Sequence, residues 1–106
     1  MGRLRVLIFQ ETPGLWVARG LEHDLVAEAR SIGESVRAVM RAVDAHTAFD
    51  LRHQHEPLSA FRPAPQKCWN SYRTGTPVPL AQLGVDPPYD WDVSVAITAR
   101  SPARSA

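Results

Sequence analysis

The chain has little cysteine, no excess of charge of one sign and no long apolar run. Its one cysteine, Cys68, excludes an intramolecular disulfide, and we expect a reducing compartment, the cytoplasm. The 12 basic and 11 acidic residues leave a net charge of +1, without the basic excess of proteins that grip duplex phosphate. No apolar run approaches a membrane span of roughly 20 residues or a signal peptide. These absences predict a soluble protein and argue against a membrane or nucleic acid as its main partner.

Length and composition indicate one ordinary globular domain. Hydrophobic residues make up 44% and charged residues 22% of the chain, which argues against wholesale disorder. We expect a single α+β domain over residues 1–100 and a flexible tail of small residues over 101–106. Most of the nine prolines lie between Pro57 and Pro88, so residues 53–89 are predicted to form an excursion without long regular elements.

The N-terminal part of the chain is typical of a three-stranded meander. Apolar side chains alternate over Arg3–Gln10, which predicts a strand, and Pro13-Gly14 favours a tight turn after it. Leu15–Gly20 and Asp24–Arg30 are predicted as the next two strands. The links between the three segments are short, so we expect antiparallel neighbours.

The first predicted strand also bears on the oligomeric state. Leu7 and Phe9 face away from Leu4, Val6 and Ile8, so the strand is apolar on parts of both faces. A sheet edge exposes unpaired backbone groups that pair with another chain unless they are protected. If this strand lies at an edge, pairing through it would bury Leu7 or Phe9, and we expect a homodimer.

A long amphipathic helix is predicted directly after the third strand. Ser31 and Glu34 have the spacing of a capping box, in which each residue satisfies an unpaired backbone N–H of the first turn. We expect the helix to run to about Ala48, or as far as Arg52, with His46 near its end, where a cation meets the negative end of the helix dipole. The apolar positions at helical spacing are Ile32, Val36, Val39, Met40 and Val43.

The second half of the chain contains two further predicted elements. A short helix is expected over about Pro65–Arg73, with Gly75 ending it. Tyr89–Ala99 alternates clearly and predicts a strand whose inward series begins at Trp91. Together these elements predict a four-stranded, mostly antiparallel sheet with one long helix packed on one face.

The order of elements resembles the HicB-like antitoxin family. The segments Val6–Glu11 and Gly14–Ala18 look like the family's opening hairpin, and Ala29–Arg37 is similar to the capped start of its helix. Arg62–Trp69 also looks like a recurrent feature of a subgroup of bacterial HicB-like proteins. The resemblance covers about the first half of the chain. No DNA-binding helical segment follows Ile97, so operator binding is not part of what it implies.

The resemblance implies a non-catalytic protein that neutralises a small ribonuclease toxin by direct contact, often as a homodimer. Aromatic and arginine side chains dominate protein interfaces. We therefore expect the partner to contact Trp69, Tyr72 and Arg73 of the short helix, with Arg37 and Arg41 of the long helix behind them. The alternative is that the short helix closes the open end of the sheet, and the sequence favours neither reading.

Two other classes of function stay open as alternatives. Glu11, Asp24 and Glu28 could serve a metal-dependent nuclease if they converged on one face, because clustered carboxylates hold divalent metal ions. An α+β sheet with surface aromatics is also a possible platform for single-stranded nucleic acid, although the near-neutral charge argues against it.

The remaining candidate groups predict neither a metal nor catalysis. His53 and His55 with Cys68 supply only one closely spaced pair, whereas structural zinc sites normally show two. Cys68 has no glycine-rich segment beside it that would stabilise an oxyanion, although Lys67 could lower its pKa slightly. We therefore predict no catalytic residue, no metal site and no cofactor.

Overall fold

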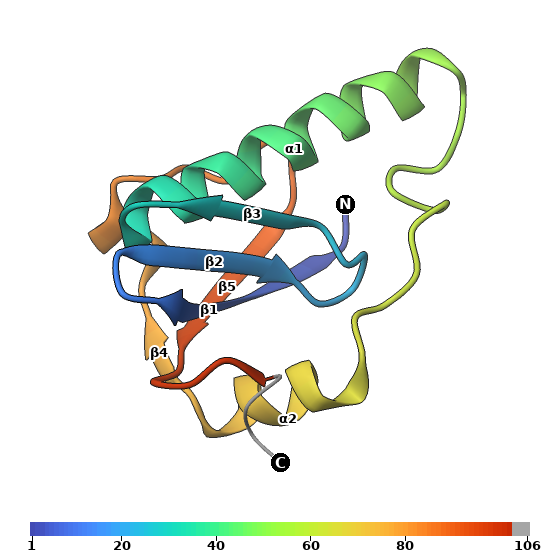
Figure 1. Cartoon of the computed structure of the whole chain (residues 1–106). Coiled ribbons are helices and arrows are strands. Elements are labelled where there is room, and N and C mark those ends of the chain that lie inside the picture. The colour runs from blue at the N-terminus through green and yellow to red at the C-terminus, as the bar shows by residue number, and fades with distance from the viewer. Residues whose placement is uncertain (103–106) are drawn as a thin grey trace.

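The computed structural model describes residues 1–102 and has a five-stranded sheet with a helix on each face (Figure 1). In chain order the elements are β1 (Arg3–Thr12), β2 (Leu15–Gly20), β3 (Val26–Ala29), α1 (Ile32–Arg52), α2 (Gln66–Thr74), β4 (Thr76–Val78), the 3₁₀ helix η1 (Leu80–Leu83) and β5 (Asp92–Ile97). The strand order is β3-β2-β1-β5-β4, with β1 and β5 parallel and all other neighbours antiparallel. The α+β class is confirmed, whereas the predicted number of strands is one too low.

β1 is the central strand of the sheet. It pairs with β2 along one edge and with β5 along the other. Leu4, Val6 and Ile8 pack with the residues of α1, while Leu7 and Phe9 pack on the opposite face with α2. The prediction of a dimer contact through this strand is therefore wrong, because both of its edges are already paired. A nearly continuous apolar run is typical of a strand covered on both faces.

The hairpin forms as predicted, but the third strand is shorter. Gly14 has a φ of 79°, a conformation that favours glycine, and it lets β1 turn into β2. Asp24 has a φ of 48° and lies in a turn, where its carboxylate accepts two hydrogen bonds from the Arg19 guanidinium. β3 can therefore begin only after this turn, at Val26.

α1 begins as predicted and continues to Arg52, the further of the two expected ends. The Ser31 hydroxyl accepts a hydrogen bond from the Glu34 N–H at 3.2 Å. His53, not His46, lies at the C-terminal cap, and its Nδ1 is 2.8 Å from the Phe49 carbonyl oxygen. His46 instead packs edge-on against Phe61 within the last turns. The buried residues of the helix are Ser35, Val36, Val39, Met40, Val43 and Thr47.

β5 joins the long helix to the sheet. Trp91, directly before the strand, is 6% exposed and donates a hydrogen bond from Nε1 to the hydroxyl of Thr47 in α1 at 3.1 Å. The prediction that Trp91 packs on the helix is therefore confirmed. The strand starts later than predicted, because Tyr89 has a φ of 52° and belongs to the preceding turn.

The proline-rich excursion contains the strand that sequence patterns missed. α2 follows Pro65 and ends at Gly75, close to the predicted helix. β4 comes directly after it and pairs with β5 at the outer edge of the sheet. Pro77 lies within β4 and Pro79 follows it. Proline has no N–H to donate to a neighbouring strand, so it is rare in central strands but tolerated in edge strands. The prolines therefore argued against a strand here, although one is present.

The chain end is packed further than predicted. Ser101 is 2% exposed and Pro102 is buried, so the expected flexible tail does not begin at residue 101. Residues 103–106, the rest of that predicted tail, lie outside the described part of the chain.

Candidate functional site

The structure divides the five predicted contact residues into two sets on opposite faces of the sheet. Trp69, Tyr72 and Arg73 belong to α2, which covers the face of Leu7 and Phe9. Arg37 and Arg41 belong to α1, which covers the other face (Figure 1). The five residues therefore do not share one face of the sheet.

The α2 set lines a groove of about 350 Å³, here called the α2 groove. Its wall is the exposed side of α2, and its floor is the sheet face over β1, β5 and β4. The lining residues are Arg5, Trp69, Tyr72, Arg73, Gly75, Pro77 and Ala96. Two half-buried aromatic rings and two arginines thus meet in one concave site, which is the composition typical of interface hot spots.

Arg5 is the groove residue whose position is fixed most firmly. Its guanidinium forms an ion pair with Glu22, and its backbone N–H donates to the same carboxylate at 2.7 Å. The guanidinium carbon lies 5.4 Å from the centre of the Trp69 ring, within the range of a cation–π contact. The loop that follows β2 therefore orients an arginine of β1 over an aromatic ring of α2.

Trp69 is fixed by the segment that enters α2. Its Nε1 donates to the Ala64 carbonyl at 3.2 Å, and the Ala64 N–H donates to the Leu21 carbonyl at 2.8 Å. Cys68, next to Trp69, is fully buried. The helix and the segment before it therefore cover this face of the sheet with Cys68 and Ala64, and the helix still presents Trp69 to the groove. The reading in which the short helix covers the sheet is therefore confirmed, and the reading in which it contacts a partner stays a prediction.

The groove continues along the sheet towards the start of β1. A second hollow shares Tyr72 and Pro77 with it and also reaches Arg3 and Ser94. Sequence reasoning missed Arg3, Arg5 and Pro77 as members of this surface. The alternation of β1 places Arg3 and Arg5 on the same face as Leu7, but only the tertiary structure shows that α2 covers this face.

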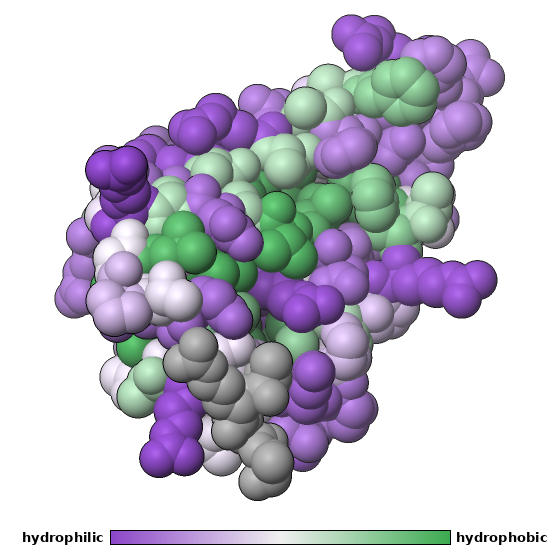
Figure 2. Space-filling model, in the orientation of Figure 1, coloured by the Kyte–Doolittle hydropathy of each residue, from purple (hydrophilic) through white to green (hydrophobic). Residues whose placement is uncertain are grey.

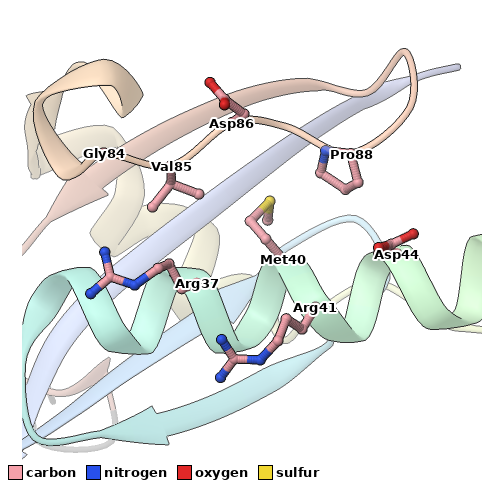
Figure 3. A pocket seen from close by; sticks show the side chains of 8 residues that line it. All are labelled: Arg37, Met40, Arg41, Asp44, Gly84, Val85, Asp86 and Pro88. Atoms are coloured by element: carbon pink, nitrogen blue, oxygen red, sulfur yellow. The ribbon is translucent and has the colours of Figure 1, made fainter.

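The α1 set lines a different groove, of about 340 Å³, between the helix and the chain around Val85. Figure 3 shows Met40 pointing towards that chain, while the side chains of Arg37, Arg41 and Asp86 diverge. Arg37 donates to the Leu83 carbonyl at 3.3 Å. Because its charges do not converge on one point, this groove has no centre for a single charged ligand.

The carboxylates of the nuclease alternative are not brought together. Asp24 is bound to Arg19 in the turn before β3, and Glu28 lies further along β3 and is exposed. Glu11 lies near the far end of β1. Among residues 1–102, no group of three or more His, Cys, Asp or Glu side chains is arranged to hold a metal ion.

The histidines and the cysteine are also apart. His53 and His55 are exposed at the end of α1, whereas Cys68 is buried beneath α2. Burial raises the pKa of the Cys68 thiol above its ordinary value, and the nearby Arg19 guanidinium offsets part of that rise. A buried thiol with a raised pKa is a poor nucleophile. Lys67 also lowers this pKa, as the sequence suggested, but less than Arg19 does.

Within the described part of the chain, no helix combines the length and the apolar character needed to cross a lipid bilayer. Comparison of the chain with protein-family models, with characterised proteins and with solved structures gives no match.

Proposed function

We propose that this chain is a cytoplasmic, non-catalytic protein-binding domain of the HicB type that holds its partner in the α2 groove. The single observation that carries the proposal is the convergence of Arg5, Trp69, Tyr72 and Arg73 in one concave site. The sequence resemblance adds the class of partner, a small ribonuclease toxin that the domain neutralises by direct contact.

The properties of the groove fit a protein surface. Arg5 and Trp69 are already held by hydrogen bonds and an ion pair, so little side-chain entropy is lost when a partner packs on them. Tyr72 is half-buried beside them and offers both an apolar ring and a hydroxyl. Arg73 is exposed and hydrogen-bonded to the neutral side chain of Asn70, which leaves its positive charge available to an acidic group of the partner.

The charge of the groove favours a protein over nucleic acid. Arg5 is paired with Glu22, and Arg3 is in register with Asp92 on the neighbouring strand. The Glu22 carboxylate offsets the charge of Arg5, and Asp92 adds a negative charge at the strand position beside Arg3. A groove that follows a phosphate backbone needs an uncompensated run of positive charge.

The test is a capture experiment with matched charge reversals on the two faces. The tagged wild-type chain, Arg73→Glu and Arg41→Glu are each exposed to nuclease-treated lysate of the source organism, and retained proteins are identified by mass. Both variants reverse an exposed helical arginine, but only Arg73 lines the α2 groove. We expect one small protein to be retained by wild type and Arg41→Glu and lost from Arg73→Glu, because truncation of a hot spot costs about 2 kcal/mol, roughly thirtyfold in Kd.

A second readout tests the class of partner. The retained protein is purified and its cleavage of RNA is measured with and without the chain. Suppression by wild type and weaker suppression by Tyr72→Ala support a toxin-neutralising role. Equal retention by all three chains, or loss only in Arg41→Glu, would show that the α2 groove is not the contact surface.

A further inference from the structure

The two edge strands of the sheet differ in how well they are protected against pairing with another chain. β4 ends one side and carries Pro77, which has no N–H to offer, with Pro79 directly after it. β3 ends the other side and contains neither proline, lysine nor arginine between Val26 and Ala29. Proteins normally protect exposed edges with proline, charge or a bulge. The edge at β4 has such protection, whereas β3 has a single charged residue, Glu28.

The backbone groups that β3 presents outward follow from its pairing with β2. The Gly20 N–H donates to the Leu25 carbonyl at 2.7 Å, which makes these residues a hydrogen-bonded pair. Hydrogen-bonded pairs alternate along an antiparallel ladder, so Ala27 also directs its N–H and C=O towards β2. Val26 and Glu28 therefore direct theirs away from the sheet, and no strand within residues 1–102 pairs with this edge.

Exposed apolar side chains lie on both faces of the sheet near this edge. Val26 is in register with Arg19 and, through it, with Leu7, so its side chain lies on the face opposite α1; it is 50% exposed, the largest exposed fraction among the bulky hydrophobic residues. On the face of α1, Phe49 is 48% exposed. α1 packs over β3, and its flank away from Arg37 carries the small side chains Ala38, Ala42 and Ala45 at helical spacing, followed by Phe49 near the end of the helix. Figure 2, drawn in the orientation of Figure 1, shows hydrophobic side chains gathered where α1 and β3 lie side by side.

We propose that β3 pairs antiparallel with β3 of a second copy of this chain, which joins two five-stranded sheets into one continuous ten-stranded sheet. The two-fold axis passes through Ala27. In this register the outward backbone groups of Val26 and of the other copy's Glu28 form a hydrogen-bonded pair, and symmetry repeats the pair. The small side chains of α1 leave room for the two helices to lie close on one face of the joined sheet.

The side chains of β3 select this register over its neighbours. A two-fold axis perpendicular to the sheet requires paired residues to face the same side, so the register changes only in steps of two residues. A shift in one direction would place the two Glu28 carboxylates directly opposite each other, which is destabilising. A shift in the other direction would set Glu28 against Asp24 and lose overlap with the end of the strand. The register centred on Ala27 instead places each Val26 against the aliphatic part of Glu28.

This inference does not depend on the proposed function. The α2 groove lies over β1, β5 and β4, and β2 separates it from the edge at β3. Arg73→Glu therefore leaves self-association unchanged, and a chain that dimerises without retaining any partner would uphold one proposal and refute the other.

Cross-linking through introduced cysteines tests the register. In a non-hydrogen-bonded antiparallel pair the Cα atoms are about 4.5 Å apart, within the range of a disulfide. Ala27→Cys is therefore expected to give a reducible covalent dimer under mild oxidation. The control is Ala29→Cys, which has the same residue type, strand and face but lies far from its own copy in this register. Cys68 is fully buried and does not compete.

A pair of charge substitutions tests the contact itself. In the proposed register Val26→Lys faces Glu28 of the other copy and Val26→Glu faces it with like charge, while both replace the same exposed side chain. Sedimentation velocity over a range of concentrations is expected to show a dimer for wild type. The dissociation constant of the dimer is expected to be about tenfold higher for the glutamate variant than for the lysine variant. A wild-type chain that stays monomeric at every concentration, or cross-linking by Ala29→Cys and not by Ala27→Cys, would overturn the proposal.

Discussion

The hydrogen bond between Trp91 and Thr47 is the contact by which the last strand holds the far half of the long helix, and we predict its contribution to stability. Thr47 is fully buried and Trp91 is 6% exposed, and the indole N–H donates to the threonine hydroxyl at 3.1 Å. Thr47→Val preserves the shape of the side chain but removes the acceptor. The indole N–H is then buried without a partner, so we expect the free energy of unfolding to fall by about 1–3 kcal/mol.

Urea unfolding followed by circular dichroism measures this loss as a lower midpoint at an unchanged slope. A double-mutant cycle with Trp91→Phe separates the hydrogen bond from packing. In the Trp91→Phe background no donor remains, so Thr47→Val is expected to be nearly neutral there. The difference between the two backgrounds is the coupling energy, about 1–3 kcal/mol.

Two results would refute this reasoning. If Thr47→Val lowers the free energy of unfolding by less than about 0.5 kcal/mol, within the range of an ordinary surface change, the contact does not stabilise the helix. If the valine substitution costs the same in both backgrounds, its cost comes from something other than the indole N–H.

Two further predictions concern the helix cap and the buried thiol. Ser31→Ala removes the acceptor of the Glu34 N–H, so it should lower the free energy of unfolding by about 1 kcal/mol. Ser31→Asn keeps an acceptor and should largely preserve the stability. Equal urea midpoints for the alanine variant and wild type would contradict this prediction. Burial raises the pKa of Cys68, so as pH rises above about 9 the unfolded chain loses the thiol proton before the folded chain does, and stability falls. Unfolding measured from pH 7 upward should show this fall in wild type to be steeper than in Cys68→Ala; parallel curves would count against the shift.

Local patterns in the sequence were enough for most of the elements. Alternation over β1 and β5, the turn at Gly14, the Ser31 cap and the end of α2 at Gly75 each depend on a few neighbouring residues, and the structure confirms each of them. These predictions agree with the structure because backbone sterics and capping hydrogen bonds act between residues that are close in sequence.

The order of the strands was not available from such patterns. The sequence left open whether β1 lies at an edge, and it is central because β5 returns from the end of the chain to pair with it in parallel. β4 was missed because Pro77 argues against a strand unless its edge position is known. Both outcomes depend on where segments distant in sequence meet.

The candidate site shows the same division between local sequence and tertiary structure. Trp69 and Tyr72 are three residues apart, so helical geometry alone places them on one face of a short helix. Only the tertiary structure decided that Arg5 of β1 lies over Trp69, and that Arg37 and Arg41 lie on the opposite face of the sheet. The sequence by itself determined most of the helices and strands and which sides of them are apolar, because those properties follow from nearby residues. The tertiary structure alone decided which charged and aromatic side chains share a surface, because that depends on packing between segments that no local rule relates.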